Sequence, residues 1–226
     1  MDTEKLFNRI AFRYDLFNSV SSFGIDKIWR RKIALSIKQH KNINILDVAV
    51  GTGDVLLSFF ENGCDIDYAA GIDVSNEMLA IAKKKLGVRK VDLKQAPAEQ
   101  IPFPDNHFDV VTCAFGVRNF SRLEAGIKEM LRVLKPNGKL LILEFSLPPN
   151  PLIRFFYLLY LKFYIPLLGK IITGNFDAYK YLSRTIQTFP SGESFCSILR
   201  DAGFDDVKTK YLTIGVVNLY SAVKPA

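Results

Sequence analysis

A glycine-containing turn, and an aspartate twenty residues beyond Gly53, carry the first chemical signal in this sequence. Residues 44–54 (NILDVAVGTGD) have the pattern of a buried strand that runs into Gly51 and Gly53 and then into a helix. Glycines at such a turn let the backbone approach a ligand, and the following helix offers unpaired N–H groups. Asp73 ends the next predicted strand, where its carboxylate can accept hydrogen bonds from two ribose hydroxyls. Together these residues predict a site for a ligand that contains a nucleoside.

Two other interpretations of the turn stay open on spacing alone. A nicotinamide dinucleotide site needs a third glycine at position 56 in the register set by Gly51 and Gly53, and Leu56 stands there. Leucine obstructs the close packing of helix on strand that the third glycine permits. The second alternative is a structural turn with no ligand. Asp73 fits the nicotinamide site equally well, so Leu56 alone disfavours that site, and the register of the turn with Asp73 disfavours the structural turn.

A sheet must position the turn and Asp73, and the rest of the chain supplies its strands. From residue 43 onward, β-like runs alternate with amphipathic segments of helix length, which is typical of a mostly parallel sheet covered by helices. Strands are predicted at residues 43–48, 68–73, 91–95, 108–115 and 139–145. Helices are predicted at residues 54–61, 76–86 and 122–134, the last closed by a Pro-Asn-Gly turn.

The last two predicted strands are connected differently. Residues 207–213 and 216–223 have only Ile214 and Gly215 between them, too few for a parallel crossover, so they are predicted to pair as a hairpin. The predicted fold class is α/β, with a doubly wound, seven-stranded, mostly parallel sheet that ends in an antiparallel hairpin. A length of 226 residues suits a single domain over residues 1–226.

Composition bounds the class of protein and its partners. Apolar residues make up 49% and charged residues 23%, the balance of a folded soluble protein. The net charge of +7 favours an anionic partner, either nucleic acid or a phospholipid surface. Cys64, Cys113 and Cys196 lack the spacing of a zinc or disulfide framework, and the charged N-terminus has no apolar core of signal-peptide length. A reducing, cytoplasmic location is expected.

Longer motifs are more specific than the glycine turn. They include YDLFN at residues 14–18, QAPAEQIPFPDNHFD at residues 95–109 and AFGVRN at residues 114–119. Further motifs lie at residues 22–25, 132–138, 143–146, 178–182 and 213–217, with Trp29 and Arg30 between them. In combination they resemble the ubiquinone and menaquinone biosynthesis C-methyltransferase family over essentially the whole chain.

The resemblance implies a class I methyltransferase fold that binds S-adenosyl-L-methionine (SAM). It assigns these residues to the cofactor: Ala49, Gly51, Thr52, Gly53, Asp73, Val74, Pro97, Ala98 and Ala114. Three positions depart from the family pattern: Val50 replaces the usual Gly, Pro97 replaces an Asn or Asp that meets the adenine, and Ala114 replaces a common Ser. Because Pro97 has no N–H, we expect the adenine contact through backbone groups near Ala98 or through shape.

The resemblance further implies methyl transfer to a ring carbon of a polyprenylated quinol: demethylmenaquinol, a methoxy-polyprenyl-benzoquinol or both. The reactive form is the quinolate, and a phenolic pKa near 10 puts roughly 4 kcal/mol between it and the neutral quinol at neutral pH. Arg118 is predicted to stabilise the quinolate. Asn119 is predicted to hold a ring oxygen or a water, while Tyr14 and Asp15 close over the site and relay the proton. The displacement needs no metal ion, and none is predicted.

An apolar segment at residues 152–172 has the length of a membrane span. Lys162 at its centre and Pro166, expected to interrupt it, argue against spanning. Two interpretations remain: a buried helix pair over the substrate pocket, or a surface element that dips into the membrane interface to collect a prenyl tail. We therefore expect an N-terminal helical cap at residues 1–40, an apolar helical insertion at residues 147–190, and peripheral contact with the inner face of the membrane.

Alternative functions belong to other classes. One is a SAM-dependent methyltransferase for another small phenol or a sterol. Nucleic-acid modification is disfavoured, because the Pro-Pro-aromatic segment of amino-methylating enzymes should follow the fourth strand, whereas Pro148 and Pro149 follow the fifth. No nucleic-acid partner is predicted, and the oligomeric state is left open between a monomer and a homodimer.

Overall fold

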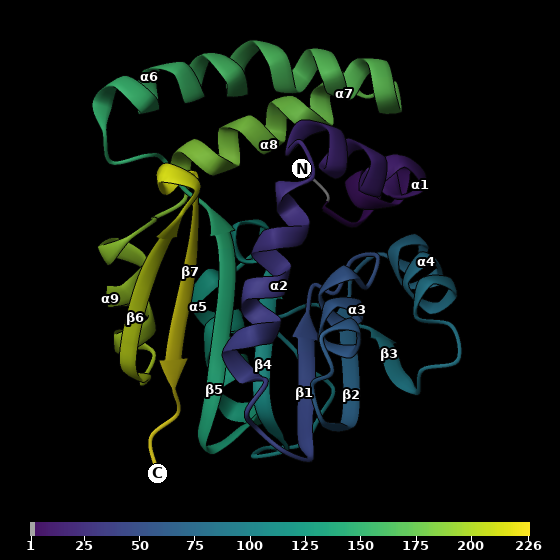
Figure 1. The fold of residues 1–226 in the computed structure, drawn as a ribbon, viewed down its shortest axis with the longest axis vertical. Helices are drawn as coiled ribbons and strands as arrows, with labels where there is room; N and C mark the ends of the chain where they lie inside the picture. The colour runs from purple at the N-terminus through teal and green to yellow at the C-terminus, as the bar shows by residue number, and fades with distance from the viewer. Residues whose placement is uncertain (1–2) are drawn as a thin grey trace.

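The fold is built on a seven-stranded sheet, and the computed structural model describes it with its helices over residues 3–226 (Figure 1). The strand order is β3-β2-β1-β4-β5-β7-β6. The first five strands pair in parallel, while β7 pairs antiparallel with β5 and β6. Their bounds are β1 Ile43–Val48, β2 Ile66–Asp73, β3 Val91–Gln95, β4 Phe108–Ala114, β5 Leu134–Phe145, β6 Asp205–Leu212 and β7 Val217–Val223. The predicted α/β class, the mostly parallel sheet and the closing hairpin are confirmed.

The fifth strand differs most from its prediction. β5 begins at Leu134, which pairs with Phe108, whereas the sequence predicts its start at Lys139. The register shifts before Val110 because the residues after Leu134 bulge out, and Asn137 adopts a left-handed φ of 63°. The prediction of a closing turn between helix and strand is therefore wrong, since the Pro-Asn-Gly segment is a bulge inside the strand.

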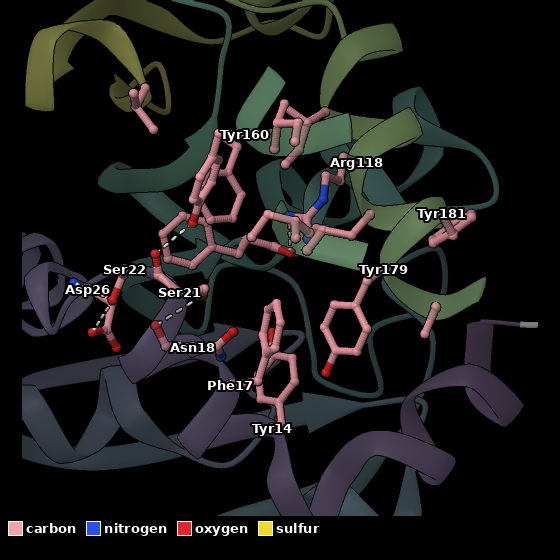
Figure 2. A pocket seen from close by; sticks show the side chains of 18 of the residues that line it. Tyr14, Phe17, Asn18, Ser21, Ser22, Asp26, Arg118, Tyr160, Tyr179 and Tyr181 are labelled. Atoms are coloured by element: carbon pink, nitrogen blue, oxygen red, sulfur yellow. Dashed lines mark hydrogen bonds between the residues drawn. The ribbon is translucent and has the colours of Figure 1, made fainter. Parts of the chain in front are cut away.

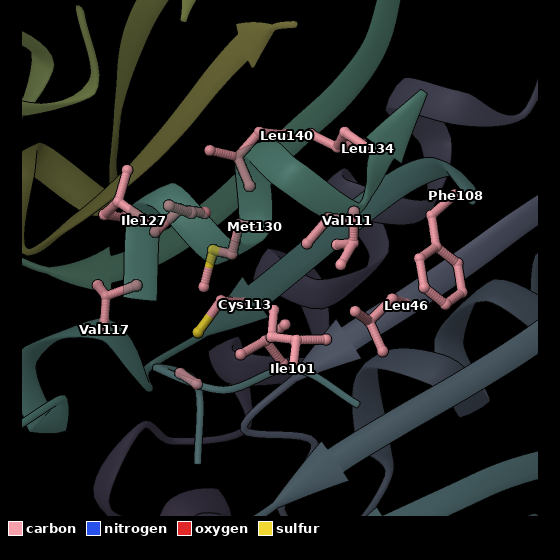
Figure 3. Packing of buried hydrophobic residues seen from close by; sticks show 14 of the residues in the cluster. Leu46, Ile101, Phe108, Val111, Cys113, Val117, Ile127, Met130, Leu134 and Leu140 are labelled. Atoms are coloured by element: carbon pink, nitrogen blue, oxygen red, sulfur yellow. The ribbon is translucent and has the colours of Figure 1, made fainter. Parts of the chain in front are cut away.

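Helices cover both faces of the sheet. On one face lie α2 (Ile25–Ile37), α3 (Asp54–Glu61) and α4 (Asn76–Leu86), and on the other lie α5 (Leu123–Val133) and α9 (Glu193–Asp201). Successive side chains of a strand point to opposite faces, so β4 gives Val111 and Cys113 to one core and Val110 to the other. Figure 3 shows the core under α5, where Met130 lies near Cys113. The sheet is thus buried on both sides, as parallel strands require.

A third group of helices forms a roof over the carboxyl ends of the parallel strands (Figure 1). It consists of α1 (Thr3–Ser21), α6 (Pro151–Leu159), α7 (Ile165–Thr173) and α8 (Phe176–Thr188), which share a separate apolar core. In that core the rings of Phe17 and Tyr179 lie 3.9 Å apart between centroids. Ligands of open α/β sheets bind at the carboxyl ends of the strands, so the roof covers the edge where a site is expected.

The predicted apolar insertion contains one continuous helical run, Pro151–Thr173, made of α6, a π-helical turn at Tyr160–Tyr164 and α7. Within the described residues it is the one helix long and apolar enough to cross a membrane, with a mean hydropathy of 1.5. Pro166 does not interrupt it, contrary to the prediction. A proline ring meets the carbonyl four residues earlier, which here belongs to Lys162 in the π turn, where the hydrogen-bond ladder is already widened.

Candidate active site

The loop after β1 is shaped by left-handed backbone conformations. Ala49, Gly51 and Gly53 have φ values of 57°, 54° and 85°. A Cβ on Gly51 would have no heavy atom within 4 Å, so open space lies above this residue, whereas a Cβ on Gly53 would lie 3.3 Å from Ala82 of α4. Gly51 therefore leaves room for a ligand, and Gly53 lets the loop pack against α4.

The Asp73 carboxylate is fixed by this loop. Its Oδ2 accepts the Gly51 N–H at 2.9 Å, and its Oδ1 accepts the Ser75 N–H at 2.9 Å. Burial raises the pKa of Asp73, while the backbone hydrogen bonds that it accepts oppose the shift. A carboxylate oxygen can accept more than one hydrogen bond, so each oxygen keeps capacity for a ligand hydroxyl.

A cavity of about 110 Å³ lies beside Asp73. Seven of the nine residues predicted to bind the cofactor line it: Ala49, Gly51, Asp73, Val74, Pro97, Ala98 and Ala114. The structure does not place Thr52 and Gly53 on its wall. The Thr52 hydroxyl instead donates to Asp15 at 2.6 Å. The cavity fits the ribose and adenine of SAM, because it offers a buried acceptor, a glycine surface and a wall of small residues.

The sequence analysis gave Gly116 no role of its own, but this residue brings the second loop of the site against the first. A Cβ at Gly116 would lie 2.7 Å from both the Cβ of Ala49 and the Sγ of Cys113, closer than atoms can pack. Gly116 also lines the cofactor cavity. Its place inside the AFGVRN motif was the available signal.

A larger cavity of about 260 Å³ adjoins the first, under the roof helices (Figure 2). Its wall is mostly apolar and aromatic, and it comes from α1, α2, the Pro151–Thr173 helix and α8. Four residues line both cavities: Phe7, Tyr14, Phe115 and Asn119. A ligand in one cavity therefore meets a ligand in the other at these four side chains.

Arg118 enters the wall of the larger cavity from a 3-10 turn, Val117–Asn119, that follows β4. Its Nη1 donates to Glu144 Oε1 at 2.6 Å and to the Phe115 carbonyl at 2.5 Å, in a buried ion pair. Its Nε and the Oδ1 of Asn119 are buried and have no hydrogen-bond partner within residues 3–226. The turn thus presents one unpaired donor beside one unpaired acceptor.

Glu144 is a site residue that the sequence analysis quoted only as part of a motif. It lies at the end of β5 and is fully buried. Burial raises the pKa of Glu144, and the adjacent Arg118 guanidinium opposes that shift. Its carboxylate holds the guanidinium in one orientation, since it accepts from both the side chain and, at 3.4 Å, the backbone N–H of Arg118.

The two residues predicted to close over the site separate in the structure. Tyr14 lines both cavities. Burial raises the pKa of its phenol, and the charge of Arg118 opposes part of that shift. Asp15 is on neither wall. Its Oδ1 accepts from Thr52 Oγ1 at 2.6 Å, and its Oδ2 accepts from Lys85 Nζ at 2.6 Å. The structure brings Tyr14 together with Arg118 and Asn119, and it places Asp15 behind the cofactor loop.

Solved structures place the architecture in a known class. The chain is similar to a SAM-dependent methyltransferase from Thermotoga maritima, with a TM-score of 0.68 at 20% identity over 98% of this chain and 99% of that one. It is also similar to phosphoethanolamine N-methyltransferase 2 of Haemonchus contortus, solved with SAM, with a TM-score of 0.63 at 18% identity over 86% of this chain and 53% of that one. The fold is that of class I SAM-dependent methyltransferases.

Sequence relatives narrow the class to a family. The model of the ubiE/COQ5 methyltransferase family matches residues 2–224, and the chain belongs to this family. It is 40% identical to the ubiquinone/menaquinone biosynthesis C-methyltransferase of Shewanella halifaxensis over 97% of this chain and 89% of the relative. It is 42% identical to that of Azotobacter vinelandii over 98% and 89%. The protein is a SAM-dependent C-methyltransferase, and the resemblance predicted from its motifs is confirmed.

Proposed function

We propose that this chain methylates a ring carbon of a polyprenylated quinol, either demethylmenaquinol or a methoxy-polyprenyl-benzoquinol. The observation that carries the proposal is the larger cavity, whose aromatic and aliphatic wall meets the cofactor cavity at Tyr14 and Asn119. A flat ring with an apolar tail matches the apolar and aromatic part of this wall, and Asn119 at the junction and Arg118 on the larger cavity are polar groups that can meet the ring hydroxyls. The names of the bacterial relatives point to the same substrates.

SAM supplies an electrophilic methyl group on its sulfonium sulfur when it is bound. The residues that would hold it are Asp73, at the ribose hydroxyls, and Gly51, Pro97 and Ala98 along the remaining wall. Pro97 has no N–H, so it offers only its carbonyl and its ring to the adenine. The cofactor assignment therefore depends most on Asp73.

Arg118 and Asn119 are suited to an ionising hydroxyl. Asn119, on the wall of both cavities, can accept the O–H of the neutral quinol, and Arg118, on the wall of the larger cavity, can donate to the oxygen once it carries charge. A guanidinium within about 4 to 6 Å of the oxygen lowers a phenolic pKa by about one to three units, which is about 1.4 to 4 kcal/mol. That range covers much of the roughly 4 kcal/mol needed to form the quinolate at neutral pH.

Tyr14 is placed to move the proton. Because burial raises its pKa, the phenol keeps its own proton at neutral pH and can pass a proton along only by accepting one as it gives another. Its side chain lies on the wall of both cavities, within reach of the quinol hydroxyl. The predicted participation of Asp15 in this relay stays a prediction.

The prenyl tail would follow the roof to the membrane. The Pro151–Thr173 helix exposes an apolar face in which Phe156 and Phe163 are 61% and 60% exposed, and Lys162 and Lys170 lie on the same helix. Aromatic rings suit the headgroup level of a bilayer, and each lysine near an anionic surface contributes about 1 kcal/mol. We therefore place this face in peripheral contact with the membrane, with Tyr157, Tyr160 and Leu161 of the same helix lining the acceptor cavity beneath it.

Purified protein tests the proposal directly. It should transfer a labelled methyl from SAM to a ring carbon of a short-tailed demethylnaphthoquinol or methoxybenzoquinol, kept reduced during the assay. The comparison panel holds a simple phenol and a sterol of similar size. Transfer to the panel but to neither quinol would support the alternative acceptor class and overturn the proposal.

A further inference from the structure

The ammonium of Lys85, near the end of α4, joins three segments around the cofactor loop. It donates to Asp15 Oδ2 of α1 at 2.6 Å, to Asp54 Oδ1 at the start of α3 at 2.5 Å, and to Thr52 Oγ1 at 2.9 Å. An ammonium has three donors, so all of them are used. Lys85 is the cation between two carboxylates, those of Asp15 and Asp54.

The ion pairs continue beyond Lys85 into the sheet-facing helices. Asp54 Oδ2 lies 3.3 Å from Arg30 Nη2, and Arg30 Nη1 lies 2.5 Å from Asp26 Oδ2. Arg30 and Asp26 belong to α2, and both are buried. Charges of alternating sign therefore connect α1, α4, α3 and α2, and Asp15 is the residue through which α1 contacts Lys85.

A second polar contact holds the other end of α1. Ser75 Oγ, at the N-cap of α4, donates to Asn8 Oδ1 at 2.5 Å. Ser75 also gives its N–H to Asp73, whose other oxygen takes the N–H of Gly51, the neighbour of Thr52. Ser75 and Gly51 are thus the two donors that fix the carboxylate of Asp73. α1 contacts Ser75 directly, and it contacts Thr52, the residue after Gly51.

Helix geometry links these contacts to the cavities. Asn8 and Asp15 are seven residues apart, or about two turns, so they lie on one side of α1. Phe7 and Tyr14, each one residue earlier, have the same spacing and line both cavities. Holding Asn8 and Asp15 in place therefore sets where Phe7 and Tyr14 meet the two ligands.

From these contacts we propose that Lys85 is a positioning residue that latches α1 over the cofactor cavity. In this proposal α1, which gives Phe7 and Tyr14 to the wall of the cofactor cavity, slows the departure of the cofactor product while the Lys85–Asp15 contact holds it in place. The proposal depends on SAM and its demethylated product alone, and it stands whichever acceptor the enzyme uses.

Lys85→Met tests the latch, because methionine keeps the length and apolar character of the stem and removes the charge. We expect the dissociation rate constant of S-adenosylhomocysteine, measured by surface plasmon resonance, to rise about tenfold, or about 1.4 kcal/mol. Lys84→Met is the matched control, since Lys84 is an exposed neighbour that carries the same charge. Lys85→Arg should restore slow dissociation, because a guanidinium can also bridge two carboxylates.

Asp15→Asn changes the other partner of the Lys85–Asp15 contact, so it tests the proposal even if Lys85→Met fails to fold. Its effect on dissociation should match that of Lys85→Met, and the double variant should be no faster than either single one, because each single variant already lacks the Lys85–Asp15 contact. Dissociation rates equal to that of Lys84→Met in both variants would overturn the proposal. So would a double variant whose two effects multiply, since that result makes the two side chains independent. A proton-relay role for Asp15 predicts instead a loss in kcat with unchanged dissociation.

Discussion

Replacement of Arg118 by lysine separates the two tasks that the structure gives this side chain. A lysine ammonium can keep the ion pair with Glu144, which now occupies Nη1 at 2.6 Å. It cannot reproduce the planar fork of the guanidinium, whose buried Nε has no hydrogen-bond partner within residues 3–226. Arg118→Lys should therefore preserve the fold and the affinity for SAM and lose stabilisation of the quinolate.

The size of the loss follows from the pKa of the acceptor. If the guanidinium lowers the quinol pKa by about one to three units, its loss costs about 1.4 to 4 kcal/mol and reduces kcat about tenfold to a thousandfold. The direction in which the pH dependence of kcat should shift also follows. Without the guanidinium the quinol ionises at higher pH, so the rise of kcat with pH should move upward in Arg118→Lys.

The assay is kcat against pH with the better of the two quinol acceptors, together with calorimetric titration of SAM. Arg122→Lys serves as the control, because Arg122 is exposed four residues further on and contacts Glu99 through its backbone N–H, at 2.9 Å, which the substitution keeps. A kcat for Arg118→Lys within about threefold of wild type, well under one pKa unit of lost stabilisation, would refute the role of Arg118 at the reacting oxygen.

Three further predictions concern the cofactor, the buried acid behind it and the membrane face. Asp73→Ala should weaken SAM binding by roughly 2 to 4 kcal/mol, because it removes two charge-assisted hydrogen bonds; wild-type affinity in a calorimetric titration would contradict the assignment. Burial raises the pKa of Asp47 to about 7, against about 3.9 in an unfolded chain, so the native state binds the extra proton between these values. This contribution to the free energy of unfolding is full below about pH 4 and is lost as the pH rises to about 7, roughly 4 kcal/mol in all. The free energy of unfolding of Asp47→Asn, measured with denaturant, should lack this dependence on pH. The protein should sediment with anionic vesicles at low salt, release as salt rises and fail to bind as the Phe156→Ser, Phe163→Ser double variant; equal binding to neutral vesicles at every salt would indicate insertion instead.

The part of the fold that depends on local pattern could be predicted from the sequence. β1, α3, α4 and β3 occupy the predicted residues because each is bounded by its own turn or cap, such as Ser75 at the start of α4. The start of β5 could not be predicted in this way. Leu134 joins the strand by pairing with Phe108, a partner far away in the sequence, and the bulge that this pairing requires looks like a turn in the sequence.

The same difference, between local pattern and partners far away in the sequence, decides which residues of the site could be predicted. Arg118 and Asn119 follow a predicted strand of the sheet, so their place at its carboxyl edge was predictable, and the structure puts them on the cavity wall. Tyr14 lines the cavity, whereas Asp15, about 100° around α1, contacts Thr52 and Lys85, partners from other elements that have no local signal in the sequence. The contacts of Lys85 and Glu144 left no local signal, since each depends on a partner from another element of the fold.

The quinones of cells that lack this protein test the central claim most directly. Lipid extracts of the deletion strain and its parent would be separated and their quinones identified by mass. The account predicts that a quinone one methyl group lighter accumulates in the deletion strain, and that expression of the wild-type chain, but not of the Arg118→Lys variant, restores the methylated form. Fully methylated quinones at parental levels in the deletion strain, which carries no second enzyme of this family, would contradict it.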